Sequence, residues 1–90
     1  MILETTKGNF ELLKNHREAF DIAKFQDRYI EEIFDKFTYL VGDVSNDILR
    51  IKGFSSDPKS KNSFKTIPDY LNESCVINAK FFILKRIRNK

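Results

Sequence analysis

The sequence predicts a small single α+β domain over residues 1–90, with a mostly antiparallel sheet, one long amphipathic helix and one short helix in the order ββαββαβ. Three observations support this class: short apolar stretches around a turn at the N-terminus, an apolar pattern of helical spacing in residues 21–37, and β-branched and aromatic runs in the second half. A hydrophobic content of 41%, with nine Phe residues, is sufficient for a buried core.

The N-terminal segment predicts a β-hairpin. Apolar residues at 2–3 and within 10–13 flank a turn at residues 6–9. Gly8 supplies the positive φ angle that such a turn accepts at little steric cost.

The long helix is predicted to begin at Asp21, whose carboxylate can cap the first turn, with Phe20 and Phe25 placed to pack as a hydrophobic staple. Its apolar face is expected to pack on the sheet rather than to hold a cofactor. That face consists of residues three and four apart: Ile22, Phe25, Tyr29, Ile30, Ile33, Phe34 and Phe37.

Two strands are predicted next, at residues 38–41 and 48–54, paired as an antiparallel hairpin. Gly42 and Asp43 are expected to open the polar turn between them. Residues 55–63 contain no apolar side chain and predict a flexible loop.

A short helix is predicted from Thr66, with Asp69 at the third helical position of a capping box and Tyr70 and Leu71 facing inward. The final strand, residues 79–87, is apolar on both sides, which favours a strand covered on two faces. Residues 88–90 are expected to be a frayed tail.

Several functional classes are disfavoured by composition. Cys75 is the only cysteine and His16 the only histidine, so we expect no disulfide, no metal site and no cofactor built on these residue types. The carboxylates of Asp43 and Asp47 are interpreted as turn-stabilising groups, His16 as a loop residue before a helix and Cys75 as a buried structural residue. No catalytic residues are therefore assigned, and the protein is predicted not to be an enzyme. No signal peptide or membrane-spanning run is found, which predicts a cytoplasmic protein.

The charge is distributed unevenly along the chain. Residues 1–47 carry ten acids and six bases, and residues 48–90 carry ten bases and three acids, giving formal charges of −4 and +7. Such a distribution can direct an RNA or an acidic protein toward one side of the fold.

Basic and aromatic residues alternate in two of the predicted strands. Arg50, Lys52 and Phe54 share one side of the first, and Lys80, Phe82 and Arg86 share one side of the last. If the two strands are neighbours with these sides matched, cations surround aromatic rings, as in single-stranded nucleic-acid binders. The candidate RNA-binding or ribosome-binding residues are Arg50, Lys52, Phe54, Lys80, Phe82, Lys85, Arg86 and Arg88. Lys59, Lys61 and Lys65, in or near the loop after the first of these strands, are expected to extend this surface.

Three alternatives stay open beside RNA binding. The first is a protein-interaction module in which a strand edge or the turn around Asp43 docks an acidic protein and no nucleic acid is involved. The second is an ordinary solvated basic face with Phe54 and Phe82 in the core. The third is an enzyme whose site is assembled from residues that no sequence pattern brings together.

Several segments resemble the YutD-like family of small bacterial proteins. The most specific is Gly42-Asp43 followed, after a short turn, by Leu49-Arg50-Ile51-Lys52-Gly53-Phe54; further matches lie at residues 24–29, 69–75 and 79–85. The resemblance covers about three-quarters of the chain. It implies a compact α+β fold in a bacterial cytoplasm and supplies no activity. This chain lacks the aromatic residue that the family usually carries after Gly-Asp, and it lacks a second late cysteine.

Overall fold

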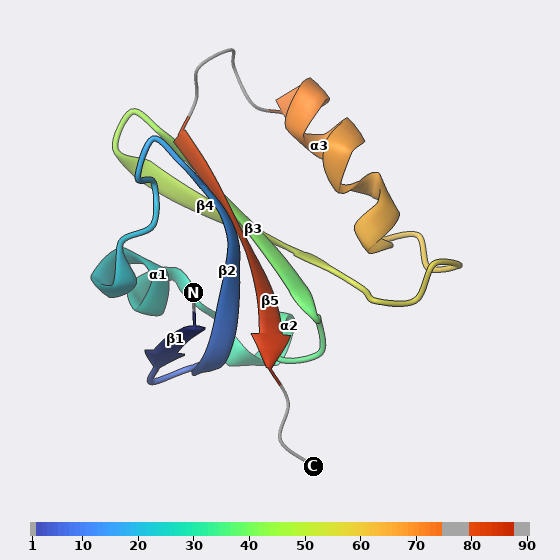
Figure 1. The fold of residues 1–90 in the computed structure, drawn as a ribbon, viewed down its shortest axis with the longest axis horizontal. Coiled ribbons are helices and arrows are strands. Elements are labelled where there is room, and N and C mark those ends of the chain that lie inside the picture. The colour runs from blue at the N-terminus through green and yellow to red at the C-terminus, as the bar shows by residue number, and fades with distance from the viewer. Residues whose placement is uncertain (1, 75–79, 88–90) are drawn as a thin grey trace.

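The computed structural model describes residues 2–74 and 80–87 and shows a five-stranded sheet with helices on both faces (Figure 1). All pairings are antiparallel and the strand order is β1-β2-β5-β3-β4. The predicted class and the order ββαββαβ are confirmed, although the second helical segment also contains a 3-10 turn. The elements are β1 (Ile2–Thr5), β2 (Gly8–His16), α1 (Ile22–Arg28), α2 (Glu31–Phe34), β3 (Tyr39–Ser45), β4 (Ile48–Phe54), η1 (Phe64–Thr66), α3 (Ile67–Ser74) and β5 (Lys80–Ile87).

The register divides the side chains between two faces, because cross-strand partners point to the same side of a sheet. Asp43 of β3 is paired with Arg50 of β4 and with Phe81 of β5, which is paired with His16 of β2. This row lies on the face that α3 packs against, called here the α3 face. The neighbouring row, which includes Phe82, lies on the opposite, α1–α2 face.

The α1–α2 face carries the larger core. Phe25 is buried and its ring lies 5.4 Å from Phe10 and 6.3 Å from Phe82. The predicted cap and staple are confirmed: Asp21 accepts from the first-turn amides, and the Phe20 and Phe25 rings are 5.7 Å apart. The smaller core on the α3 face joins Val41, Phe54 and Ile67, with Tyr70 and Leu71 packed against it as predicted.

The predicted long helix is divided into α1 and α2, because Tyr29 and Ile30 adopt extended backbone angles (φ −73° and −111°). The break turns Phe34 into the core, whereas Ile30 and Ile33 are each 46% exposed. A β-branched residue at position 30 tolerates the extended conformation well. The Tyr29 hydroxyl, held by Asp35 and Arg86, fixes the chain at this point.

Gly42 and Asp43 do not form a turn, contrary to the sequence-based expectation. Both are buried within β3, and the turn is formed by Asn46 and Asp47, whose φ angles of 52° and 63° suit a two-residue hairpin. Gly42 is required by packing: a Cβ there would lie 2.1 Å from the Phe82 ring.

The segment after β4 is a hydrogen-bonded loop. Ser55 forms a parallel bridge with Ser63, and Phe64 donates its amide to the Ser55 carbonyl at 2.8 Å. Ser63 caps η1 by accepting from the Lys65 amide, so the helical segment begins three residues before the predicted Thr66. The predicted flexibility of residues 55–63 stays a prediction.

The last strand occupies the centre of the sheet, between β2 and β3, so it is not an edge strand. Its α1–α2 side is buried at Phe82 and Leu84, whereas Phe81 and Ile83 on the α3 face are partly buried. Cys75, Arg88 and the predicted frayed tail lie outside the described residues. Within the part of the chain that the structure describes, no helix is long and apolar enough to cross a membrane.

Candidate functional site: the open edge of strand β4

The cationic sides of β4 and β5 do not meet, so the predicted strand neighbourhood is wrong. Strand β3 lies between them, and the register places the two sets of side chains on opposite faces. Arg50, Lys52 and Phe54 lie on the α3 face with Lys85, and Lys80, Phe82 and Arg86 lie on the α1–α2 face. The reason is that β5 enters the sheet between β2 and β3 and leaves β4 at the edge.

The two aromatic rings of the predicted platform are buried. Phe54 is 1% exposed and Phe82 is 0% exposed. Phe82 is covered by α1 and packs over Gly42, and Phe54 packs edge-on against Tyr70 of α3 at 5.6 Å. Neither ring can stack on a nucleic-acid base, so this part of the predicted platform is wrong.

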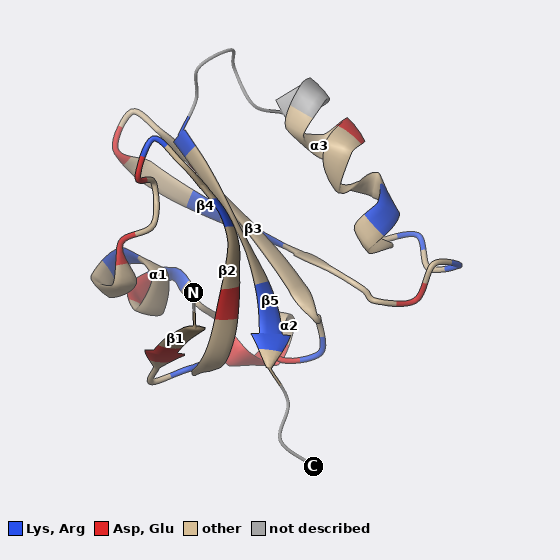
Figure 2. Ribbon diagram, viewed as in Figure 1, with Lys and Arg blue, Asp and Glu red and all other residues tan. Residues whose placement is uncertain are grey.

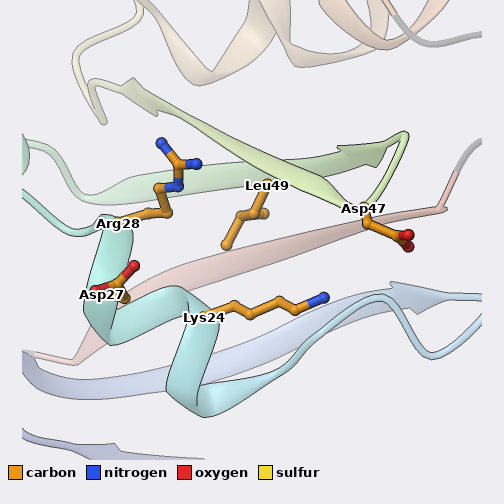
Figure 3. A pocket seen from close by; sticks show the side chains of 5 residues that line it. All are labelled: Lys24, Asp27, Arg28, Asp47 and Leu49. Carbon is orange, nitrogen blue, oxygen red and sulfur yellow. The ribbon is translucent and has the colours of Figure 1, made fainter.

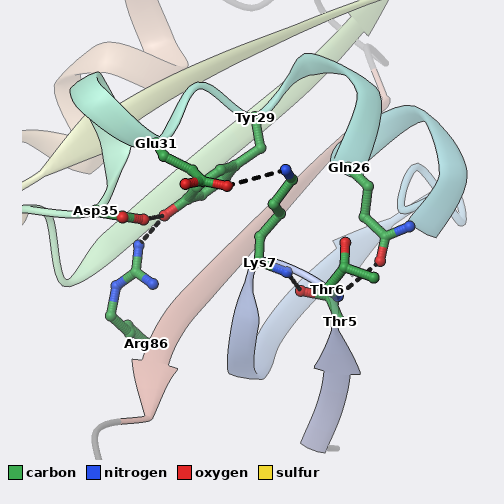
Figure 4. A network of polar contacts seen from close by, with 8 residues as sticks. All are labelled: Thr5, Thr6, Lys7, Gln26, Tyr29, Glu31, Asp35 and Arg86. Carbon is green, nitrogen blue, oxygen red and sulfur yellow. Dashed lines mark hydrogen bonds and ion pairs between the residues drawn. The ribbon is translucent and has the colours of Figure 1, made fainter.

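Arg86 is a structural residue (Figure 4). Its guanidinium donates to the carbonyl oxygens of Phe34 and Phe37 at 3.1 Å each and to the Tyr29 hydroxyl. The guanidinium carbon also lies 4.9 Å from the centre of the Phe10 ring. These contacts close the end of α2 and hold the guanidinium within the fold, which does not fit the predicted role in nucleic-acid binding.

On the α3 face, Arg50 is anchored by a buried carboxylate. The Asp43 side chain is 3% exposed and accepts from the half-exposed Arg50 guanidinium at 2.5 Å. Tyr70 of α3 lies 3.4 Å from the other carboxylate oxygen. Because Asp43 lies on β3, next to the edge strand, this group joins β3, β4 and α3 and fixes the guanidinium end of the Arg50 side chain.

A hollow of about 270 Å³ lies beside β4 on the α3 face. The Lys52 ammonium lies 5.5 Å from the Tyr70 ring centre and 5.9 Å from that of Phe54, so it is held over the hollow by cation–π contacts. The lining contains two lysines and one carboxylate, which favours an anionic group. The lining residues are Lys52, Phe54, Lys61, Asn62, Thr66, Asp69 and Tyr70.

A second hollow, of about 200 Å³, lies beside β4 on the α1–α2 face (Figure 3). Leu49 points from β4 toward α1, belongs to the core and is 5% exposed, so it forms only the floor of this hollow. The charged groups around it are balanced, with two bases and two acids. The lining residues are Lys24, Asp27, Arg28, Asp47 and Leu49.

Basic and acidic segments are mixed over the molecule (Figure 2). Arg50 and Lys52 place basic segments on β4, which is the edge of the sheet and pairs only with β3 among the described strands.

The sequence missed most of the residues that line these hollows. Lys61 was visible only as one of several loop lysines, and no local pattern brings Asn62 or Asp69 to β4. The signal that could have found the site is the Ser55 to Ser63 segment, whose turn-forming side chains bring the chain back to the end of β4.

The single histidine lies in a strand. His16 lies at the end of β2 and stacks on Phe81 at 5.1 Å, rather than lying in a loop before a helix. Across residues 2–74 and 80–87, no group of three or more His, Cys, Asp or Glu side chains could hold a metal ion.

Comparison with known proteins gives consistent results. The family described as "Putative antitoxin YutD-like" matches residues 4–85. A protein of Bacillus subtilis (strain 168), "Putative antitoxin YutD", is 39% identical over 85 residues, which cover 90% of this chain and 92% of that protein. The solution NMR structure of protein yutD from B. subtilis superposes with a TM-score of 0.78 at 33% identity, covering 99% of this chain and 84% of that one.

Proposed function

Because this chain belongs to the YutD-like family, we propose that it is a non-enzymatic binding protein whose basic edge holds an acidic surface of a partner protein. The family and the B. subtilis relative both carry the description "putative antitoxin", and one way in which an antitoxin protein counteracts a toxin is by binding it. A protein partner is therefore the ligand class that this description favours.

The observation that carries the proposal is the cationic hollow beside β4. Lys52 and Lys61 line it, and Arg50 stands next to it on the same face. Complementary charge of this kind accelerates association and selects the partner.

The test is capture of partner proteins from nuclease-treated lysate of the source organism, followed by calorimetry with the purified partner. Lys52→Glu combined with Lys61→Glu should weaken the binary affinity by at least about tenfold. Lys14→Glu combined with Lys36→Glu is the matched control, because each pair of reversals takes the formal charge from +3 to −1 and neither control residue lines the hollow.

Equal loss of affinity in both double variants would contradict the proposal, since a general change in charge would then explain the effect. Loss of every partner after nuclease treatment would favour RNA binding instead. Fluorescence anisotropy with a short labelled RNA at low and high salt would establish that second reading.

A further inference from the structure

Only every second residue of β4 directs its backbone amide and carbonyl groups toward β3. Ser45 and Ile48 close a two-residue turn, and such a pair exchanges hydrogen bonds across the hairpin. Because bonded and non-bonded pairs alternate, Arg50 and Lys52 direct their amide and carbonyl groups toward β3. The amide and carbonyl groups of Leu49, Ile51 and Gly53 are directed away from the sheet.

The chain itself already pairs along this outer edge. Ser55, two residues beyond Gly53, donates its amide to the Asn62 carbonyl at 2.5 Å and accepts from the Phe64 amide at 2.8 Å. Residues 62–64 thus add to the edge at Ser55, in the parallel direction. Further along β4, no segment of residues 2–74 or 80–87 pairs with the edge.

The two hollows lie on opposite faces of this edge. One lies on the α3 face beside Lys52, and the other on the α1–α2 face beside Leu49. Successive side chains of a strand point to opposite faces, so a strand added to β4 would place alternate side chains in the two hollows.

The residues that line the two hollows indicate which side chains an added strand would carry on each face. Side chains on the α3 face would meet Arg50, Lys52 and Lys61, which favours carboxylates. Side chains on the other face would meet Leu49 and a charge-balanced rim, which favours apolar residues. A second copy of β4 is disfavoured, because it would bring the Arg50 and Lys52 side chains of two molecules together.

We propose that β4 accepts an extended segment of the partner protein as an additional strand, with acidic side chains on the α3 face alternating with apolar side chains on the α1–α2 face. This inference rests on the proposed function and specifies how the same site binds. The edge lysines have a second effect, since they oppose pairing between copies of this chain while attracting an acidic strand.

The test uses a capped octapeptide of alternating Glu and Val, titrated into the isotope-labelled full chain and followed by NMR. Amide exchange at Leu49, Ile51 and Gly53 should slow by at least about tenfold, whereas exchange at Arg50 and Lys52, already paired with β3, should change little. The Lys52→Glu, Lys61→Glu variant should bind the peptide with an affinity at least about tenfold lower than that of the wild type. The Lys14→Glu, Lys36→Glu control should bind it with the affinity of the wild type.

Two methylated peptides separate strand addition from side-chain docking. In a strand, alternate amides face the edge, so N-methylation of all Val residues or of all Glu residues should abolish binding in one case and preserve it in the other. Equal affinities of the two methylated peptides would overturn the inference, as would absence of any shift at millimolar peptide. A further outcome would also overturn the inference. If the same amides become protected without peptide as the protein concentration rises, and sedimentation shows dimers, the edge of β4 pairs with a second copy of this chain.

The two proposals fail separately. If the peptides do not add to β4 but capture of the protein partner still depends on Lys52 and Lys61, only the strand addition is lost. If partner binding is insensitive to these lysines, the proposed function is lost.

Discussion

The two faces of the sheet use their arginines in opposite ways. On the α1–α2 face, Arg86 donates to two carbonyl oxygens and a hydroxyl and packs over a ring. On the α3 face, one end of Arg50 is fixed by buried Asp43 while the side chain stays 55% exposed. The Arg86 side chain therefore serves the structure, because its guanidinium bonds to groups within the protein. The Arg50 guanidinium is bound by Asp43, but more than half of its side chain is accessible to solvent.

The difference follows from how each face is covered. The α1–α2 face is filled by aromatic rings from both helices and accommodates Phe82 only because residue 42 is glycine. The α3 face has a smaller core around Val41, Phe54 and Ile67. Cationic side chains line a hollow on each face, but Lys24 and Arg28 on the α1–α2 face share theirs with two carboxylates, whereas Lys52 and Lys61 on the α3 face share theirs with one. Sequence charge alone could not separate these two environments.

The largest effect is expected from Arg86→Met. The substitution keeps much of the side-chain volume but leaves two carbonyl oxygens and the Tyr29 hydroxyl without their donor, so the free energy of unfolding should fall by about 3 to 4 kcal/mol. Urea denaturation measures it. Arg86→Lys should recover little, because one ammonium group cannot reproduce the guanidinium geometry. Full recovery by lysine would show that charge alone matters at this position.

A smaller loss, of about 2 kcal/mol, is expected from Arg50→Met, because Asp43 then remains buried with only part of its hydrogen bonding. The exposed guanidinium makes the loss smaller than at Arg86, since water can replace part of its contribution. Adding Asp43→Asn should restore part of the stability, and the double-mutant cycle measures the coupling. Additive losses in the cycle would mean that the two side chains are not energetically linked.

The sequence predicted the elements better than their mutual placement. Local signals were sufficient for the Asp21 cap and for strand β4, whose predicted limits are confirmed. The insertion of β5 between β2 and β3 is a long-range choice that no local pattern encodes, and it decides which cations share a face.

The functional site was predicted only in part for the same reason. Arg50 and Lys52 were correctly placed together by strand alternation, whereas Arg86 has the same local pattern and lies on the other face. Helical periodicity likewise predicted Ile30 and Ile33 to be buried, because it assumes an unbroken helix. The hydrogen bonds of the Tyr29 hydroxyl to Asp35 and Arg86, which are specific to the tertiary fold, hold the break.

The smallest expected effect is a pH dependence of stability that comes from the Tyr29 hydroxyl on the α1–α2 face. Burial raises the pKa of Tyr29 above its ordinary value of 10.0, the hydrogen bond to Asp35 adds to the rise, and Arg86 opposes it. The folded state therefore holds this proton more tightly than the unfolded chain. Its contribution is complete below about pH 10 and is lost as the pH rises through the raised pKa of the folded protein.

Thermal unfolding between pH 9 and pH 11.5 measures this contribution against Tyr29→Phe. The wild type should lose stability more steeply with pH than the variant, so the difference between them should narrow above about pH 10. Asp35→Asn should show an intermediate slope, because one cause of the raised pKa of Tyr29 is removed. Parallel curves for the wild type and Tyr29→Phe would mean that the pKa of Tyr29 is not raised in the folded protein.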